Sequence, residues 1–179
     1  SGVNGKMAAM LGLQQLHILL PKENTLKKLF TFVPVEKAME VRQAIFTAGG
    51  GHIGNYSECS FNAEGTGTFK GGDGTNPFVG IIGEQHKEKE VKIEIIFPAW
   101  LEDKLVAAMK LAHPYEEVAY DVVNLANANN NVGAGIIGFL PDPISETVFL
   151  AKLKEIFKVP VVRHTLFTGR PVHQVALCG

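Results

Sequence analysis

Two stretches of this chain, Leu29–Pro34 (LFTFVP) and Val91–Pro98 (VKIEIIFP), have the apolar character of β-strands, and each ends at a proline. A helical pattern follows each stretch, in VEKAMEVRQAIFTAG and in AWLEDKLVAAMKLAH. The apolar positions with helical spacing are Ala38, Val41, Ile45 and Ala48 in the first helix, and Leu101, Leu105, Ala108, Met109 and Ala112 in the second. The sequence therefore predicts the same strand–helix unit twice.

The two units match at a constant offset. Pro98 lies 64 positions after Pro34, and Tyr120 lies 64 positions after Tyr56. Each unit then reads strand, proline, helix, turn and a strand that contains a tyrosine. Two such units in tandem form the ferredoxin-like arrangement, in which both helices cover one face of an antiparallel sheet. We expect an α+β fold with a duplicated β-α-β domain of this type.

Added strand material separates the units, between residues 58 and 90. We expect an extended segment around Thr66, Thr68 and Phe69, then a loop (KGGDGTNP), then a further strand (FVGIIG). Extra strands on a small sheet leave edges that must be covered or paired with another chain. The sequence therefore favours a homo-oligomer that associates through sheet edges.

A third block follows an Asn-rich linker and is separate from the duplicated domain. AGIIGFL is predicted as a strand, SETVFLAKLKEIF as a helix, and VPVVRHTLFTGRPVHQVALC as two strands around Thr168-Gly169. The inward residues predicted for that helix are Phe149, Leu153, Ile156 and Phe157. We expect three parts, at residues 1–25, 26–127 and 132–179. Residues 1–13 predict an unpacked helix, and the chain stops at Gly179 where a strand-to-helix turn is expected, so we expect an internal piece of a longer protein.

The composition excludes several classes of partner. Hydrophobic residues make up 46% of the chain and charged residues 20%, with 17 basic and 18 acidic side chains and a net charge of −1. This balance lacks the basic footprint of a nucleic-acid-binding protein. No apolar run approaches the roughly 18 residues of a membrane helix, and no leader pattern is visible, so we expect a cytoplasmic protein. Cys59 and Cys178 are predicted to be free thiols.

The stretch GGGHIGNYSECSF, residues 49–61, has three interpretations: a metal site, an anion-binding loop, or the end of a helix without a chemical role. Its first glycines suit the left-handed end of a helix, and the others let the backbone approach a ligand or a neighbouring chain. His52 is either a ligand contact or a structural residue near the helix end. Glu58 and Cys59 are adjacent on a predicted strand and would face opposite sides, which argues against a metal site here. The turn from His52 through Asn55 to Tyr56 remains as a surface for a subunit contact or a small ligand.

The corresponding stretch of the second unit is AHPYEEVAYD. His113 at a helix C-terminus is stabilised by the helix dipole whether or not it has a further role. The internal pseudo-symmetry predicts that both helix exits lie at one edge of the domain. His52 and His113 could then converge within a subunit or across an interface, and with Cys59 or Glu116 could bind a divalent metal.

Other motifs point away from catalysis. The glycine-rich GTGTFKGGDGTNP lacks the ending of a phosphate loop and does not lie between a strand and a helix. We expect it to be a solvated hairpin loop or one that packs on a neighbouring chain. No serine has the nucleophile-elbow pattern, so no catalytic residue is predicted.

Three stretches, AGGGHIGNYSECSFNAEGTGTF, GTNPFVG and AHPYEEVAYDV, closely resemble the domain inserted into bacterial members of the NGG-interacting-factor-three-like family, commonly named GTP cyclohydrolase I type 2 homologues. SGVNGKMAAMLGL resembles the end of the first half of the family's main domain. GAGIIGFLPDPISETVFLAKLKEIFKVPVVRHT, with VALCG, resembles the beginning of its second half. The resemblance thus extends over nearly the whole chain.

The resemblance implies a toroidal homohexamer that holds two divalent metal ions in each split main domain, on His, Asp and Glu ligands. It also implies that the inserted domain is similar to the trimeric, ferredoxin-like CutA and PII proteins. The family's metal motifs fall outside residues 1–179, so no metal or cofactor is expected in this chain itself. Glu58 is a further departure, because family members often have histidine there.

Three functional hypotheses follow. In the first, the insert is an oligomerisation and small-ligand regulatory module, with self-association as a trimer or hexamer. In the second, the longer parent is a metal-dependent hydrolase of a purine nucleotide, and this piece alone is inactive. In the third, the insert binds a divalent metal as CutA does. The residues predicted for ligand or interface contacts are His52, Asn55, Tyr56, His113 and Glu116, with Cys59 added in the metal hypothesis.

Overall fold

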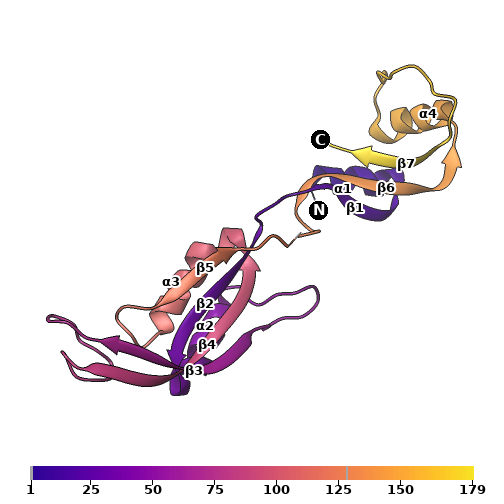
Figure 1. The fold of residues 1–179 in the computed structure, drawn as a ribbon. Helices are drawn as coiled ribbons and strands as arrows, with labels where there is room; N and C mark the ends of the chain where they lie inside the picture. Colours follow the sequence, from indigo (N-terminus) through magenta and orange to yellow (C-terminus); the bar gives the residue numbers. More distant parts are fainter. Residues whose placement is uncertain (1, 128) are drawn as a thin grey trace. The chain divides into compact units, whose positions relative to one another are not determined.

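The computed structural model describes residues 2–127 and 129–179, which form two compact units (Figure 1). One unit joins the stretches Ser1–Lys22 and Ala128–Gly179, and the other is Glu23–Asn127. Each unit has its own sheet and its own apolar core.

The Glu23–Asn127 unit is a four-stranded sheet with two helices. Its elements are β2 (Leu26–Pro34), α2 (Ala38–Thr47), β3 (Phe61–Lys70), β4 (Gln85–Pro98), α3 (Glu102–Ala112) and β5 (Tyr120–Asn124). A short 3-10 turn, Val35–Lys37 or Ala99–Leu101, precedes each helix. The strands lie in the order β3-β4-β2-β5, and every neighbouring pair is antiparallel. Each β-α-β unit therefore has a strand of the other unit between its own two strands, which is the ferredoxin-like topology. The predicted α+β fold class is confirmed.

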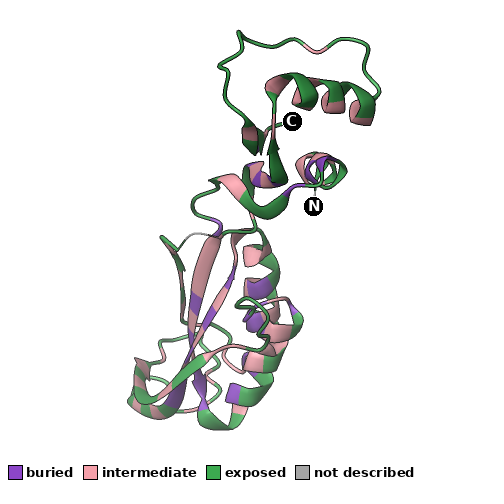
Figure 2. Cartoon of the chain, turned by 90° about the vertical axis from the view of Figure 1, so that its right-hand side faces the viewer, coloured by how far each residue is buried: buried purple, intermediate pink, exposed green. Residues whose placement is uncertain are grey.

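The core of this unit lies between the helices and one face of the sheet, where buried residues gather in Figure 2. Alternate residues of β4, Val91, Ile93, Ile95 and Phe97, point into it. The helix positions predicted to face inward all contribute to this core or pack against it. Each large apolar side chain buried here contributes roughly 1.5–3 kcal/mol to folding.

The two helices end by different means. After α2 the amide of Gly49 donates to Phe46 O and that of Gly50 donates to Ile45 O, at 2.9 and 3.1 Å. Gly49 has a φ of 109°, so this is the glycine-dependent helix end that the sequence predicts. After α3 the chain instead becomes extended at His113, just before a proline.

Two predicted strands in this unit are wrong. Tyr56 lies outside any strand and forms an isolated bridge with Ile53 around a two-residue turn. Gly54 and Glu58 have positive φ, at 58° and 57°, so the chain cannot stay extended before Phe61. Residues 78–83 are irregular for the same reason, because Gly80 and Gly83 also have positive φ. The loop between β3 and β4 consequently runs from residue 71 to 84.

The second unit is smaller. It contains α1 (Val3–Leu11), β1 (Gln14–Pro21), β6 (Gly133–Ile144), α4 (Glu146–Phe157) and β7 (Val172–Leu177), with an antiparallel sheet in the order β1-β6-β7. The inward residues predicted for α4 all pack on its core. The strand predicted before Thr168 is wrong, since residues 159–171 contain none. There the Glu146 carboxylate accepts hydrogen bonds from the amides of Thr168 and Gly169, at 2.8 and 3.0 Å, and holds a loop instead.

Candidate functional site

The face of the four-stranded sheet away from α2 and α3 is uncovered by any helix described in this unit (Figure 2). Its side chains alternate with the core residues along each strand. Phe30 and Phe32 project from β2 on this face, and Glu90, Lys92 and Glu94 project from β4, as the pairing of the strands shows. This open face is the surface on which a site can form.

A cavity of about 650 Å³ lies at one end of the open face. β3 and β4 form its floor, the loop 71–84 forms one wall, and the segment after α3 forms another. Gly65 and Gly67 both lie on the open side of β3, opposite Glu90 and Glu88. Gly65 leaves the floor bare, and Gly67 makes room for the Glu90 carboxylate. The aromatic rings of Phe69, Phe78 and Tyr115 are part of the lining.

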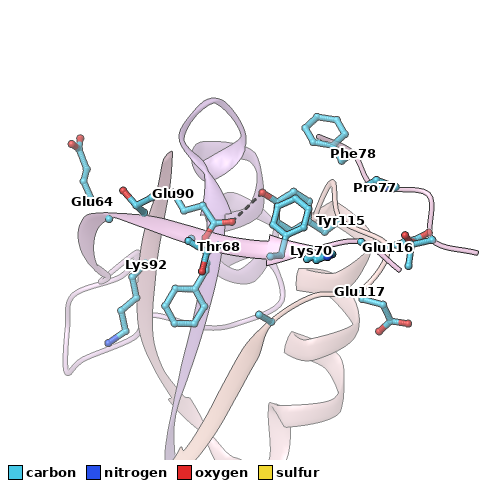
Figure 3. Close-up of a pocket in the computed structure, with 18 of the residues that line it drawn as sticks. Glu64, Thr68, Lys70, Pro77, Phe78, Glu90, Lys92, Tyr115, Glu116 and Glu117 are labelled. Atoms are coloured by element: carbon cyan, nitrogen blue, oxygen red, sulfur yellow. Dashed lines mark hydrogen bonds between the residues drawn. The ribbon is translucent and has the colours of Figure 1, made fainter. Parts of the chain in front are cut away.

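The buried carboxylate of Glu90 is the central polar group of this cavity. Only 8% of Glu90 is exposed, and its Oε1 accepts a 3.0 Å hydrogen bond from the Tyr115 hydroxyl (Figure 3). Its Oε2 accepts no hydrogen bond from any described residue. Burial raises the pKa of the Tyr115 phenol, and the bond to Glu90 raises it further. Tyr115 therefore remains a neutral donor at physiological pH.

The loop 71–84 is held against the cavity by contacts with the segment after α3. The amide of Asn76 donates to Glu116 Oε1 at 2.9 Å. The ring of Tyr115 lies 6.2 Å from that of Phe78 and 6.1 Å from that of Phe69, between centroids. These are distances at which aromatic pairs attract each other. The wall is thus tied to the floor through Tyr115 and Glu116.

His113 is buried and acts on the site through Tyr115. Its Nδ1 accepts a hydrogen bond from the Tyr115 amide at 3.1 Å, so the proton lies on Nε2, which donates to Phe32 O at 2.9 Å. Burial lowers the pKa of His113, although the bond to Phe32 and the charge of Glu90 oppose this. Both ring nitrogens are occupied, so neither is available for a metal ion.

The structure does not bring the sequence-predicted residues together. Within the chain, the amide of Gly51 binds Ile96 O, whereas His113 binds Phe32 O. Ile96 pairs with Lys28, four residues from Phe32 along β2, which corresponds to about 13 Å. The expected convergence of the two helix exits inside one subunit is therefore wrong. The reason is that β2 and β4 are antiparallel, so the pseudo-symmetry places the exits toward opposite ends of the sheet.

The remaining predicted residues divide between two places. His52, Asn55 and Tyr56 are exposed on the turn after α2, where Tyr56 is 76% exposed. Glu116 lines the cavity. Cys59 is half-buried and does not lie on a strand, so the strand argument that separated it from Glu58 does not apply.

No group of three or more His, Cys, Asp or Glu side chains suited to a metal ion exists among residues 2–127 and 129–179. The donor set of a dinuclear centre therefore does not fit the described part of this chain. Cys59 and Cys178 are both free thiols.

The residues that make the cavity, chiefly Gly67, Phe69, Glu90 and Tyr115, are not among those predicted from the sequence. A signal for them existed in GTGTF, residues 65–69, because alternate glycines in a strand mark a close approach. Glu90 gave no such signal, since it is the last residue of the charged run HKEKE and has no distinguishing pattern.

The Glu23–Asn127 unit thus defines a class: a ferredoxin-like α+β domain with a cavity of small-molecule size on its open sheet face. The sequence model of the family Duf34/NIF3 (NGG1p interacting factor 3) matches residues 1–179. This chain belongs to that family.

Relatives and solved structures agree with this assignment. The chain is 44% identical over 179 residues to a GTP cyclohydrolase 1 type 2 homolog of Halalkalibacterium halodurans, and 39% identical to one of Bacillus subtilis. In both cases 99% of this chain and 48% of the relative are covered, so the chain spans about half their length. A Bacillus cereus protein related to NIF3 is similar in structure, with a TM-score of 0.83 and 43% identity, over 99% of this chain and 47% of that one.

No helix among the described residues is both long and apolar enough to cross a membrane.

Proposed function

We propose that the Glu23–Asn127 unit is a homo-oligomerisation and small-ligand regulatory module of a longer, metal-dependent protein. The observation that carries the first role is the open sheet face. At the end of this face away from the cavity lie Phe61, which is 65% exposed, and Val123, which is 40% exposed. Exposed apolar side chains on an uncovered sheet are typical of a protein interface.

A second copy of the chain suits this surface for two reasons. The outer edges of β3 and β5 have no strand partner within the unit, and such edges pair readily with another chain. The carboxylate beside the apolar residues is already paired, because Glu94 accepts bonds from Lys92 at 2.8 Å and from Lys28 at 3.2 Å. Burying this group against another copy therefore leaves no unpaired carboxylate, which would be costly. We propose a trimer of the unit, and a trimer or hexamer of the longer protein.

Sedimentation equilibrium of the 179-residue chain tests this role. We expect the wild type to associate, and Phe61→Asp to shift the equilibrium toward monomer by placing a charge in the interface. Leu111→Asp is the matched control, because Leu111 is 90% exposed but lies on α3, on the other side of the sheet. A wild-type chain that is monomeric at all concentrations would refute the oligomerisation role.

The dinuclear metal centre belongs to the longer protein in this proposal. The described residues lack its donor set, and the chain spans about half of its curated relatives. The name of those relatives, GTP cyclohydrolase 1 type 2 homolog, also favours a second candidate, in which the longer protein hydrolyses a purine nucleotide with metal-activated water. The 179-residue chain should then show no such activity, and any GTP ring opening by it would contradict the location of the site outside these residues.

A further inference from the structure

The cavity on the open face combines apolar and charged surface. The rings of Phe69, Phe78 and Tyr115 offer apolar contact, while the carboxylate of Glu90 lies at the floor. Small-molecule sites have this composition: mostly apolar walls with a few polar groups that fix the orientation of the ligand.

One oxygen of the Glu90 carboxylate is free to accept a hydrogen bond from a ligand. Oε1 has the Tyr115 hydroxyl, whereas Oε2 has no donor among the described residues. Oε2 does not belong to the fully buried side-chain oxygens of the described residues that lack a partner, so it keeps contact with the space of the cavity. A carboxylate in a residue that is only 8% exposed is stabilised by hydrogen bonds or opposite charge that compensate for lost water. A ligand that brings N–H donors to Oε2 supplies this compensation.

Gly67 makes room for the carboxylate at the floor of the cavity. A Cβ on Gly67 would collide with Glu90 Oε2, so the missing side chain gives the carboxylate its place on β3. A Cβ on Gly65 would meet nothing within 4 Å, so the floor beside Glu90 is open as well. A flat group can therefore lie on this bare strand with its edge at the carboxylate.

The charges around the cavity favour a cation. Four acidic residues line it, and Lys70 and Lys92 are the only bases in the lining. Lys92 is engaged elsewhere, since its Nζ binds Glu94 and lies 4.5 Å from the centroid of the Phe30 ring. Glu90 has no described ion pair of its own, so a cationic ligand would be its only full partner.

We propose that this cavity binds an aromatic cation with two adjacent N–H donors, of the amidinium or guanidinium type. The donors bind Glu90, and the ring packs against Phe69, Phe78 and Tyr115. Paired N–H groups match a carboxylate in geometry as well as in charge. This inference rests on the proposed ligand-binding role of the unit and is independent of its oligomerisation.

Isothermal titration of the 179-residue chain with benzamidine tests the inference, with benzamide and benzoate as probes of nearly the same shape. We expect benzamidine to bind about tenfold or more tightly than either, because charge-assisted hydrogen bonds are stronger than neutral ones. Equal binding of benzamide would overturn the requirement for a cation. Preferred binding of benzoate, or no binding of benzamidine, would overturn the site.

Substitutions locate the binding. Glu90→Gln keeps the size of the side chain and its bond from Tyr115, and should weaken benzamidine binding by about tenfold or more. Glu40→Gln removes the same charge from an exposed side chain of α2, on the other side of the sheet and outside the cavity lining, and should leave binding unchanged. Equal effects of the two substitutions would contradict a specific role for Glu90. The wild-type comparison of the three probes does not depend on how either variant folds.

The same samples separate this inference from the oligomerisation role. Phe61→Asp should still bind benzamidine, because Phe61 pairs with Glu94 and does not line the cavity. An oligomer that does not bind benzamidine would refute the ligand class and leave oligomerisation standing. A wild-type monomer that does bind benzamidine would refute oligomerisation and leave the ligand class standing.

Discussion

The Tyr115 hydroxyl donates a 3.0 Å hydrogen bond to Glu90 Oε1, and this bond connects the segment after α3 to the first half of β4. The backbone amide of Tyr115 is held in turn by His113 Nδ1. A buried histidine, a tyrosine and a carboxylate thus form one connected series beside the cavity. Substituting its members and measuring the free energy of unfolding shows how much this series stabilises the fold.

Tyr115→Phe removes the hydroxyl of this series and should lower the free energy of unfolding at pH 7 by about 1 kcal/mol. The effect should disappear at high pH. The pKa of Tyr115 is raised above 10.0 in the folded protein, so the unfolded chain loses the phenolic proton first as the pH rises. Wild-type stability should therefore fall more steeply than that of the variant above pH 10. Urea unfolding from pH 7 to 11 checks this, and parallel curves would contradict it.

Gly67→Ala should displace the Glu90 carboxylate, because the new Cβ would occupy the place of Oε2. Loss of the Tyr115 bond and strain together should destabilise the protein by about 1–2 kcal/mol. Gly65→Ala is the matched control, two residues away on the same strand face with nothing near its Cβ. In a Glu90→Ala background the cost of Gly67→Ala should vanish. Equal stability of the two alanine variants in urea would rule out this account.

Much of the fold could be predicted because it rests on periodic patterns. The apolar residues of α2, α3 and β4 repeat at the spacing of their element, and the matching prolines Pro34 and Pro98 show the duplication. The failures came where single backbone angles decide the outcome. Gly54, Glu58 and Gly80 take positive φ and interrupt segments whose composition suits a strand.

The site could be predicted only in part, because it depends on contacts between distant segments. Glu116 was identified from its place after a helix, but its bond with the amide of Asn76 crosses 40 residues of sequence. Glu90 and Tyr115 are 25 residues apart and meet only when β4 and the end of α3 are both in place. No periodicity in one sequence encodes such a pair.

His113→Gln should make the free energy of unfolding depend less on pH in the acidic range. Burial lowers the pKa of His113 below 6.5, so the unfolded chain takes up the proton first as the pH falls. The free energy of unfolding of the wild type should therefore decrease as the pH drops below about 6.5, and the variant should lose this component. Urea unfolding at pH 7 and pH 5 measures the difference. His52→Gln, at an exposed position, controls for the loss of a histidine, and identical slopes for wild type and His113→Gln would disprove the prediction.

Gly51→Ala tests whether the glycines after α2 serve packing. Gly51 has a φ of 75°, and a Cβ there would lie 2.8 Å from both Cys59 O and the ring of Phe46. Backbone strain and crowding together should destabilise the unit by about 2–4 kcal/mol. Gly54→Ala shares the positive φ, at 58°, but its Cβ would meet nothing within 4 Å, so it should cost only about 1 kcal/mol. Urea denaturation of both variants gives the comparison. Should Gly51→Ala prove no more costly than Gly54→Ala, close packing of this turn against Cys59 would not explain the glycine.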